Sequence, residues 1–413
     1  MSGILYPAYQ KLYSALSCLK RFNVEASFID NIANLDTFFS EFRNITFVIQ
    51  KSIGNKKTYE KNRDLYLAEL KWFVDKRNET TKEKPFQLIK EIIVTVYNHH
   101  KNFEITRKIF TLEDDIPIPS FLKDLKKELS NFNNHEVFFS AEFFFHENGS
   151  DIDLIEKLFE GISSMFAFLE AMENELQDNC KYCNLLKDKI RSFEFLMTPR
   201  QSYKSIDYVY YPSKDLFEKA KVSHANLSLN GLIPLSRIPS ETITKFDLFD
   251  FDGTFFGNLT YMQAIIQSDQ KNDIMPLFGL LYSDGTCILD IFNSTIKTTL
   301  FRKIYEIAQL IKNGDITEVC YIGNASALEC SKNDFKYVPK ISKERIALST
   351  VELLICAKLD INLNSMEYVF NKKYLKTPDY IKCTMKDRSF DRLYNCRALF
   401  KPIQEAFEQV NAQ

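Results

Sequence analysis

Apolar residues in the first part of the chain recur at intervals of three and four residues, which is the period of an α-helix. One such stripe lies in the segment FFSEFRNITFVIQ, and Gly54 and Asn55 end it. We expect a first helix over Ile4–Arg21, a second that carries this stripe, and a third that begins at Thr58. The apolar positions of the stripe are Leu35, Phe38, Phe42, Ile45 and Ile49.

The apolar stripe of the third predicted helix ends at a basic residue. The stripe consists of Tyr66, Leu70 and Phe73. Arg77 follows on the same helical face, with Asn78 beside it at the expected helix end before Pro85. An arginine stays charged at ordinary pH and needs hydrogen-bond acceptors there. Two interpretations stay open: Arg77 and Asn78 cap the helix, or Arg77 binds an anionic ligand.

The charge balance around this helix is mildly basic. Between positions 55 and 84 there are nine Lys or Arg residues and six acidic residues. An anionic ligand would explain the excess, and so would a solvated helix face.

The next segment, residues 87–99, fits two kinds of element. We expect a short helix, although the run Ile92–Val96 would also form a strand. With this helix included, residues 1–110 are predicted to form a helical domain.

Residues 111–200 are predicted to contain a linker, a strand and a long helix. A proline-containing, lysine-rich stretch opens the region. The apolar segment Glu136–His146 predicts a strand that ends in a turn. Asp151 or Asp153 then caps a helix that extends to about Leu196.

After Tyr208, short apolar runs separated by turn residues predict mainly strands. Residues 246–259 and 276–292 each carry Asp-Gly-Thr between two apolar runs, so both predict β-hairpins. The other predicted elements are helices over 293–312, 342–359 and 395–410 and a strand over 317–322. We therefore expect residues 201–413 to form an α+β domain with a largely antiparallel sheet, within an α+β chain.

Composition narrows the classes of protein further. The 413 residues are 45% hydrophobic and 26% charged, with a net charge of −2, so no overall field attracts nucleic acid or an acidic membrane. The chain contains neither GxGxxG nor GxxxxGK[ST], so we expect no nucleotide cofactor. The first residues lack a signal-peptide core, and the apolar runs are too short to span a membrane. A cytoplasmic protein that does not enter the membrane is expected.

The nine cysteines are scattered along the chain, and their odd number argues against a secreted disulfide framework. Cys180 and Cys183 form a single CxxC pair on a predicted helix. This pair has no neighbouring histidine and lacks the second pair of ligands that zinc needs. We expect two buried or adjacent thiols on one helical face, and a redox or zinc role is the alternative.

The segment Phe249-Asp250-Phe251-Asp252-Gly253-Thr254 resembles the first motif of haloacid-dehalogenase-like phosphohydrolases. The resemblance implies Mg²⁺-dependent hydrolysis of phosphate esters, with Asp250 as nucleophile and Asp252 as general acid and base. Residues in the order of the later motifs are Ser283, Lys297 or Lys303, and Gly323-Asn324. The sequence departs from the family because the last of these motifs lacks its carboxylate and because Ser283 and Lys297 lie too close for a crossover helix.

Arg77 and Asn78 resemble the first half of the signature of HEPN-type domains, the helical modules of toxin, phage-defence and CRISPR-associated ribonucleases. The histidine that completes the signature is replaced by Lys82. In the family, arginine would stabilise the phosphate and histidine would handle the 2′-hydroxyl proton, whereas a protonated lysine is a poor base. The resemblance covers about residues 30–110. It implies a homodimer, and either a non-cleaving version that binds RNA or a protein, or a differently built site.

The main hypothesis is therefore an intracellular HEPN-like binding or regulatory protein of a defence or toxin-type system. It would contact RNA through Arg77, Asn78 and Lys82, and it would be ribonuclease-like if active. His99 or His100 would supply the missing base if the next helix folds back. The alternatives are the Mg²⁺-dependent phosphohydrolase and a structural interaction protein.

Overall fold

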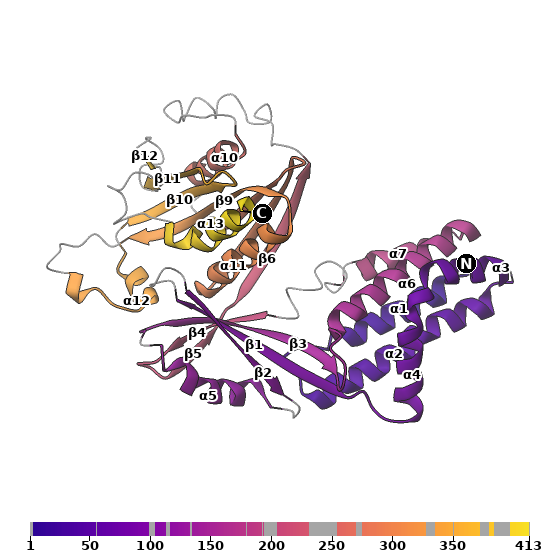
Figure 1. The fold of residues 1–413 in the computed structure, drawn as a ribbon. Coiled ribbons are helices and arrows are strands. Elements are labelled where there is room, and N and C mark those ends of the chain that lie inside the picture. The colour runs from indigo at the N-terminus through magenta and orange to yellow at the C-terminus, as the bar shows by residue number, and fades with distance from the viewer. Residues whose placement is uncertain are drawn as a thin grey trace. The chain divides into compact units, whose positions relative to one another are not determined.

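The computed structural model describes residues 3–54, 56–98, 104–112, 116–132, 134–178, 180–191, 193, 205–230, 254–269, 275–327, 335–349, 351–371, 380–383 and 397–412. Helices and two antiparallel sheets give an α+β fold, which confirms the predicted fold class (Figure 1). The chain divides into two compact units that interleave along the sequence. The first consists of Met1–Thr95, Arg107–Asn131 and Ala141–Ile206, and the second of Val96–Thr106, Phe132–Ser140 and Asp207–Gln413.

The first unit is mainly helical. Its helices are α1 (Tyr6–Leu19), α2 (Phe28–Ser52), α3 (Lys56–Tyr66), the short 3-10 helix η1 (Ala68–Leu70), α4 (Lys71–Lys82), α5 (Ile118–Leu129), α6 (Leu154–Leu176) and α7 (Lys181–Arg191). Helix α1 packs against α2 and α7, α2 packs against α4, and α3 packs against α6. All five residues of the predicted stripe on α2 are buried, so this prediction is confirmed.

Aromatic rings fill the space between α2 and α4. The ring of Phe73 lies 5.0 Å from that of Phe42, and the ring of Trp72 lies 5.6 Å from that of Phe39. Such rings contribute much of the packing energy of a core. This cluster fixes the face of α4 that meets α2.

The third predicted helix is in fact two helices. Helix α3 ends at Tyr66, and α4 begins at Lys71 after the turn of η1. The predicted helix end at Arg77 and Asn78 is wrong, because α4 continues to Lys82. An ion pair of 2.8 Å between Lys76 and Glu79, three residues apart, supports the helix across this point.

The five-stranded sheet has the order β2-β1-β3-β4-β5. Its strands are β1 (Leu88–Asn98), β2 (Glu104–Leu112), β3 (Val137–Glu147), β4 (Ser205–Tyr211) and β5 (Leu216–Lys219). The helix predicted for residues 87–99 is wrong, because the run from Ile92 to Tyr97 forms a buried part of β1. The predicted strand Glu136–His146 is confirmed as β3.

Asp153 caps α6: its Oδ1 accepts hydrogen bonds from the backbone N–H groups of Ile155 (3.0 Å) and Glu156 (3.4 Å). The sequence left Asp151 and Asp153 as alternatives, and the structure selects the second. The helix predicted as far as Leu196 is interrupted, because Gln177 adopts a left-handed conformation that ends α6.

The second unit contains a seven-stranded sheet of order β12-β11-β10-β9-β7-β8-β6. Its strands are β6 (Val222–Asn230), β7 (Leu277–Tyr282), β8 (Thr286–Ser294), β9 (Ile316–Ala327), β10 (Val351–Asp360), β11 (Ser365–Asn371) and β12 (Tyr380–Cys383). Helices α11 (Thr298–Asn313) and α13 (Arg397–Asn411) cover one face of the sheet, and α10 (Phe255–Asp269) covers the other. The unit thus has three layers.

Several predictions in this unit are confirmed and two are wrong. The hairpin over 276–292 is β7–β8, with Gly285 at φ +83° in its turn, and helices α11 and α13 lie where expected. Residues 255–259 of the other predicted hairpin belong instead to α10. The predicted helix over 342–359 is a short helix, α12 (Ser342–Ala347), followed by β10.

Candidate anion-binding site

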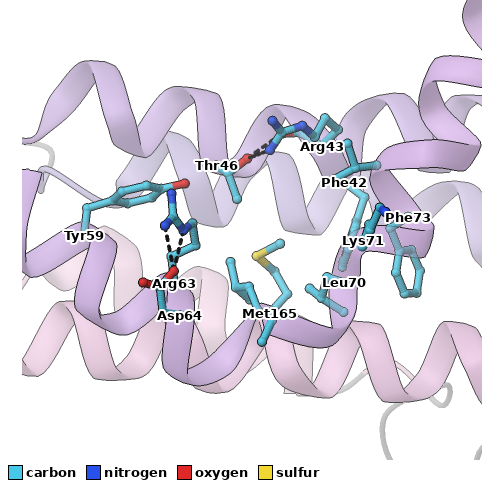
Figure 2. Close-up of a pocket in the computed structure, with 13 residues that line it drawn as sticks. Phe42, Arg43, Thr46, Tyr59, Arg63, Asp64, Leu70, Lys71, Phe73 and Met165 are labelled. Carbon is cyan, nitrogen blue, oxygen red and sulfur yellow. Dashed lines mark hydrogen bonds and ion pairs between the residues drawn. The ribbon is translucent and has the colours of Figure 1, made fainter.

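A cavity of about 310 Å³ opens in the first unit among α2, α3, η1, α4 and α6 (Figure 2). Its apolar lining comes from Phe42, Leu67, Ala68, Leu70, Phe73, Val74 and Met165. Its polar lining comes from Arg43, Thr46, Tyr59, Arg63, Asp64 and Lys71. Pockets that bind small ligands begin at about 300 Å³. The cavity therefore has room for one small ring-sized group beside several charged side chains.

The break between α3 and α4 builds one wall of this cavity. The N–H of Leu67 donates to the carbonyl of Arg63 (2.8 Å), and the N–H of Leu70 donates to the carbonyl of Leu67 (3.1 Å). This turn buries both leucines while Arg63 and Asp64 stay exposed. The apolar lining and the charged rim thus come from neighbouring positions of one short segment.

Arg43 projects from α2 at the edge of the cavity. Its Nη1 donates a hydrogen bond of 2.5 Å to Thr46 Oγ1, and its guanidinium carbon lies 4.3 Å from the ring centroid of Phe47. Burial lowers the pKa of Arg43, and of the nearby groups Tyr59 raises it while Arg77 lowers it further. The described residues offer Arg43 no carboxylate partner.

Arg77 lies on α4, and its charge acts on Arg43 across the α2–α4 contact. Its Nη1 donates to Asn78 Oδ1 at 3.2 Å, while its buried Nε meets no acceptor among the described residues. Two guanidinium groups on facing helices repel each other unless an anion lies between them. The pair Arg43–Arg77 is therefore a candidate anion-binding site.

Other basic side chains nearby are paired with acids. Arg63 bonds Asp64 at 2.6 Å, Lys61 bonds Glu175 at 2.7 Å, and Lys84 bonds Glu79 at 3.2 Å. Lys71, at the rim of the cavity, has no carboxylate partner within the described ranges. The acids of this region thus offset other cations and leave Arg43, Lys71 and Arg77 uncompensated.

The structure brings together only some of the predicted site residues. Asn78 accompanies Arg77 through the hydrogen bond given above. Lys82 is exposed at the last position of α4, five residues after Arg77 and so on a different side of the helix. His99 and His100 lie outside the described residues.

Arg43 was missed because its relation to Arg77 depends on the packing of two helices. The sequence contains one signal that pointed to it. The dipeptide Arg-Asn occurs at 43–44, beside the apolar stripe of α2, as it does at 77–78. Basic residues that border two apolar stripes meet when those stripes pack.

The residues of the phosphohydrolase resemblance are not brought together where they can be placed. Asp250 and Asp252 lie outside the described residues. Ser283 lies in the β7–β8 turn, while Gly323 and Asn324 lie inside β9. Strands β7 and β9 are antiparallel neighbours, so no parallel crossover joins them. This arrangement gives the alternative no support.

Comparisons with models of protein families, with curated proteins and with solved structures yielded no match to this chain. The described residues contain no group of three or more His, Cys, Asp or Glu side chains placed to hold a metal ion. In the same part of the chain, every helix is too short or too polar to cross a lipid bilayer.

Proposed function

We propose that the protein is a binding or regulatory protein for single-stranded RNA, with one nucleotide bound at the cavity of the first unit. The observation that carries the proposal is the pair Arg43 and Arg77, two cations on the contacting helices α2 and α4 whose charges act on each other and which have no carboxylate partner among the described residues. Guanidinium groups bind phosphate through parallel hydrogen bonds. One phosphate between the two arginines would offset their repulsion.

The cavity beside this pair suits the rest of a nucleotide. Proteins that bind single strands combine cationic side chains along the backbone with apolar and aromatic surfaces for the bases. Here Lys71 and Arg43 lie on the rim, and Phe42, Tyr59 and Met165 lie on the walls (Figure 2). A base would enter the cavity while its phosphate stays at the rim.

Binding without cleavage fits this arrangement better than catalysis. The 2′-hydroxyl must lose a proton for RNA to be cleaved, which requires a general base in reach. The cavity has no histidine in its described lining, and Lys82 lies away from Arg77. The proposal therefore assigns Arg43, Arg77 and Lys71 to phosphate contacts.

Electrophoretic mobility shift with a labelled single-stranded RNA tests the proposal. We expect Arg43→Gln and Arg77→Gln each to weaken binding about tenfold or more, because a charge-assisted hydrogen bond contributes about 1.5–3 kcal/mol. Lys51→Gln, which removes one exposed charge from the last turn of α2, is the matched control and should bind as the wild type does. Equal affinity of all four proteins would exclude the site.

The HEPN-like resemblance adds two further proposals: the chain forms a homodimer, and it acts in a defence or toxin-type system. Light scattering of the purified protein tests the first. If the molecular mass equals that of one chain at all concentrations, the dimer is excluded. This result would not bear on the proposed RNA site, because Arg43 and Arg77 belong to one chain.

A further inference from the structure

Two cysteines lie at the start of α7, outside the proposed RNA site. Cys180 directly precedes the helix, and Cys183 lies in its first turn. Both are thiols in this structure. Residues three apart at a helix start lie close enough for their sulfurs to meet. The CxxC pair therefore has the local geometry of a dithiol that can close to a disulfide.

Backbone N–H groups converge on the Cys180 sulfur. Gly3 donates its N–H to Cys180 Sγ at 3.1 Å, and the N–H groups of Cys183 and Tyr182 also bond this sulfur. Such donors stabilise a thiolate, and with Cys183 as the first cause they lower the pKa of Cys180. Cys180 thus has the character of an attacking thiol.

Cys183 has the opposite character. It is fully buried, whereas Cys180 keeps 7% of its surface exposed. Burial, and to a lesser extent a hydrogen bond to Cys180, raise the pKa of Cys183 to about 12. Both thiols are buried, but Cys180 is the more exposed of the two and has the lower pKa, so it is the first nucleophile and Cys183 is the resolving thiol.

Residues 3–5, which precede α1, are held against the cysteine pair by backbone hydrogen bonds. Leu5 donates its N–H to Asp178 Oδ2 at 2.7 Å. A Cβ atom at Gly3 would lie 2.6 Å from Cys180 Cβ and 2.5 Å from Asp178 Oδ1. Only a glycine fits this approach, so the backbone at residues 3–5 depends on the geometry around Cys180.

We propose that Cys180 and Cys183 form a redox-active dithiol whose substrate is a low-molecular-weight disulfide such as glutathione disulfide. The Cys180 thiolate attacks one sulfur, the substrate S–S bond breaks, and the departing thiolate takes a proton. Cys183 then loses its proton and attacks Cys180 Sγ, which releases the second thiol. The protein loses two electrons and two protons, and one disulfide becomes two thiols.

Closure of this disulfide changes the anchoring of α1. Cys180 Sγ turns toward Cys183 and gives up its place as acceptor for the Gly3 N–H. A disulfide sulfur is also a weaker acceptor than a thiolate. Oxidation therefore breaks one hydrogen bond that holds residues 3–5 against the turn before α7, and reduction restores it.

The test begins with the wild-type, full-length protein in mixtures of reduced and oxidised glutathione, followed by alkylation and peptide mapping of all nine cysteines. The expected result is the loss of two alkylatable thiols at Cys180 and Cys183, ahead of every other cysteine, with a disulfide linking the two peptides. Hydrogen exchange at the amides of Gly3 and Leu5 should become faster on oxidation. If the pair stays alkylatable while other cysteines oxidise, the proposal is overturned.

Single variants test the assigned order of attack. Cys183→Ala should accumulate glutathione on Cys180, because no second thiol resolves the mixed disulfide. Cys180→Ala should leave Cys183 unmodified. Cys18→Ala, which removes a buried thiol of α1 outside the pair, is the control and should form the disulfide as the wild type does. Glutathione on Cys183 in Cys180→Ala at the rate seen for Cys180 contradicts the assignment.

Discussion

Gly161 of α6 lies directly against the ring of Phe73 of α4. A Cβ atom at position 161 would lie 2.1 Å from Phe73 Cζ and 2.3 Å from Cε2, far inside van der Waals contact. Phe73 also lines the cavity of the proposed RNA site. Because position 161 has no side chain, the Phe73 ring can occupy this place and form one wall of the cavity.

The first prediction is that Gly161→Ala destabilises the protein by about 1–3 kcal/mol, the usual cost of overpacking a core. Alanine favours a helix over glycine by about 1 kcal/mol, so the loss would appear despite a better helix former. Urea unfolding measures the change. Gly54→Ala is the control, since nothing lies within 4 Å of its added methyl group. An unchanged stability of Gly161→Ala would show that Phe73 shifts without cost.

The second prediction concerns the buried ion pair of Arg302 and Asp207 in the second unit. Nε and Nη2 of Arg302 donate to the two carboxylate oxygens at 2.8 and 3.1 Å, and only 8% and 1% of the two side chains are exposed. Arg302→Met leaves the carboxylate buried without its partner, so we expect a loss of about 3–5 kcal/mol. Thermal or urea unfolding measures it.

The matched control for this pair is Lys401→Met, which breaks an exposed ion pair of 3.4 Å with Glu405. Its expected cost is below about 1 kcal/mol. The double variant Arg302→Met with Asp207→Leu should recover much of the stability that the single variant loses. A double variant no better than Arg302→Met would mean that packing, and not the stranded charge, sets the loss.

The third prediction separates the two aspartates ahead of α6. Asp153→Ala removes the side-chain acceptor for two N–H groups, which should cost about 1 kcal/mol. Asp151→Ala removes an exposed carboxylate two residues earlier and should change stability by less than about 0.5 kcal/mol. Equal losses in urea unfolding would contradict the assignment of the cap.

The fourth prediction concerns pH. Burial raises the pKa of the Asp36 carboxyl above its ordinary value, and a hydrogen bond from the Phe86 N–H offsets only part of this. The folded chain thus holds this proton more tightly than the unfolded chain. Below the ordinary Asp pKa of about 3.9, protonated Asp36 therefore contributes its full share to the free energy of unfolding. This contribution is lost as the pH rises through the higher pKa of the folded chain. Ionised Asp36 destabilises the protein at neutral pH.

Asp36→Asn tests this sign because asparagine still accepts from the Phe86 N–H but does not ionise. The variant should be more stable than the wild type at neutral pH, and its advantage should shrink as the pH falls toward 4. Paired thermal melts at the two pH values measure the difference. A constant difference between the two proteins would show that the carboxyl titrates normally.

The fifth prediction concerns the salt dependence of the proposed RNA binding. Each phosphate contact that a cationic side chain makes adds to the slope of log K against log salt concentration. Arg77→Gln should therefore lower the magnitude of this slope by about one unit. Binding titrations at several salt concentrations measure it. A variant with weaker binding and the wild-type slope would place Arg77 in a structural role.

Elements whose apolar positions follow one clear period could be predicted from the sequence. Helix α2 is an example, because Leu35, Phe38 and Phe42 recur at helical spacing on one face and are all buried. Strand β1 could not be assigned with the same rule, because Ile92 to Tyr97 are all buried and show no period. Strand β10 failed for a related reason, since its buried positions do not alternate strictly.

The proposed site was only half predictable. The spacing of Phe73 and Arg77 within one helix is a property of the sequence, and it was enough to propose Arg77 as a site residue. The electrostatic effect of Arg77 on Arg43 depends on how α2 and α4 pack, and the spacing of residues within either helix does not reveal this packing. The turn at Leu67 likewise contains neither glycine nor proline, so no helix-breaking residue marks it in the sequence.

The chain has a single indole, Trp72, and it lies in the aromatic cluster between α2 and α4, 4.9 Å from the ring of Phe73. Its fluorescence comes from this one location, beside the wall of the cavity. Emission wavelength and quenching therefore follow events at the cavity in the unlabelled protein, with no signal from tryptophan elsewhere. Binding of an oligonucleotide can therefore be followed directly by the fluorescence of Trp72.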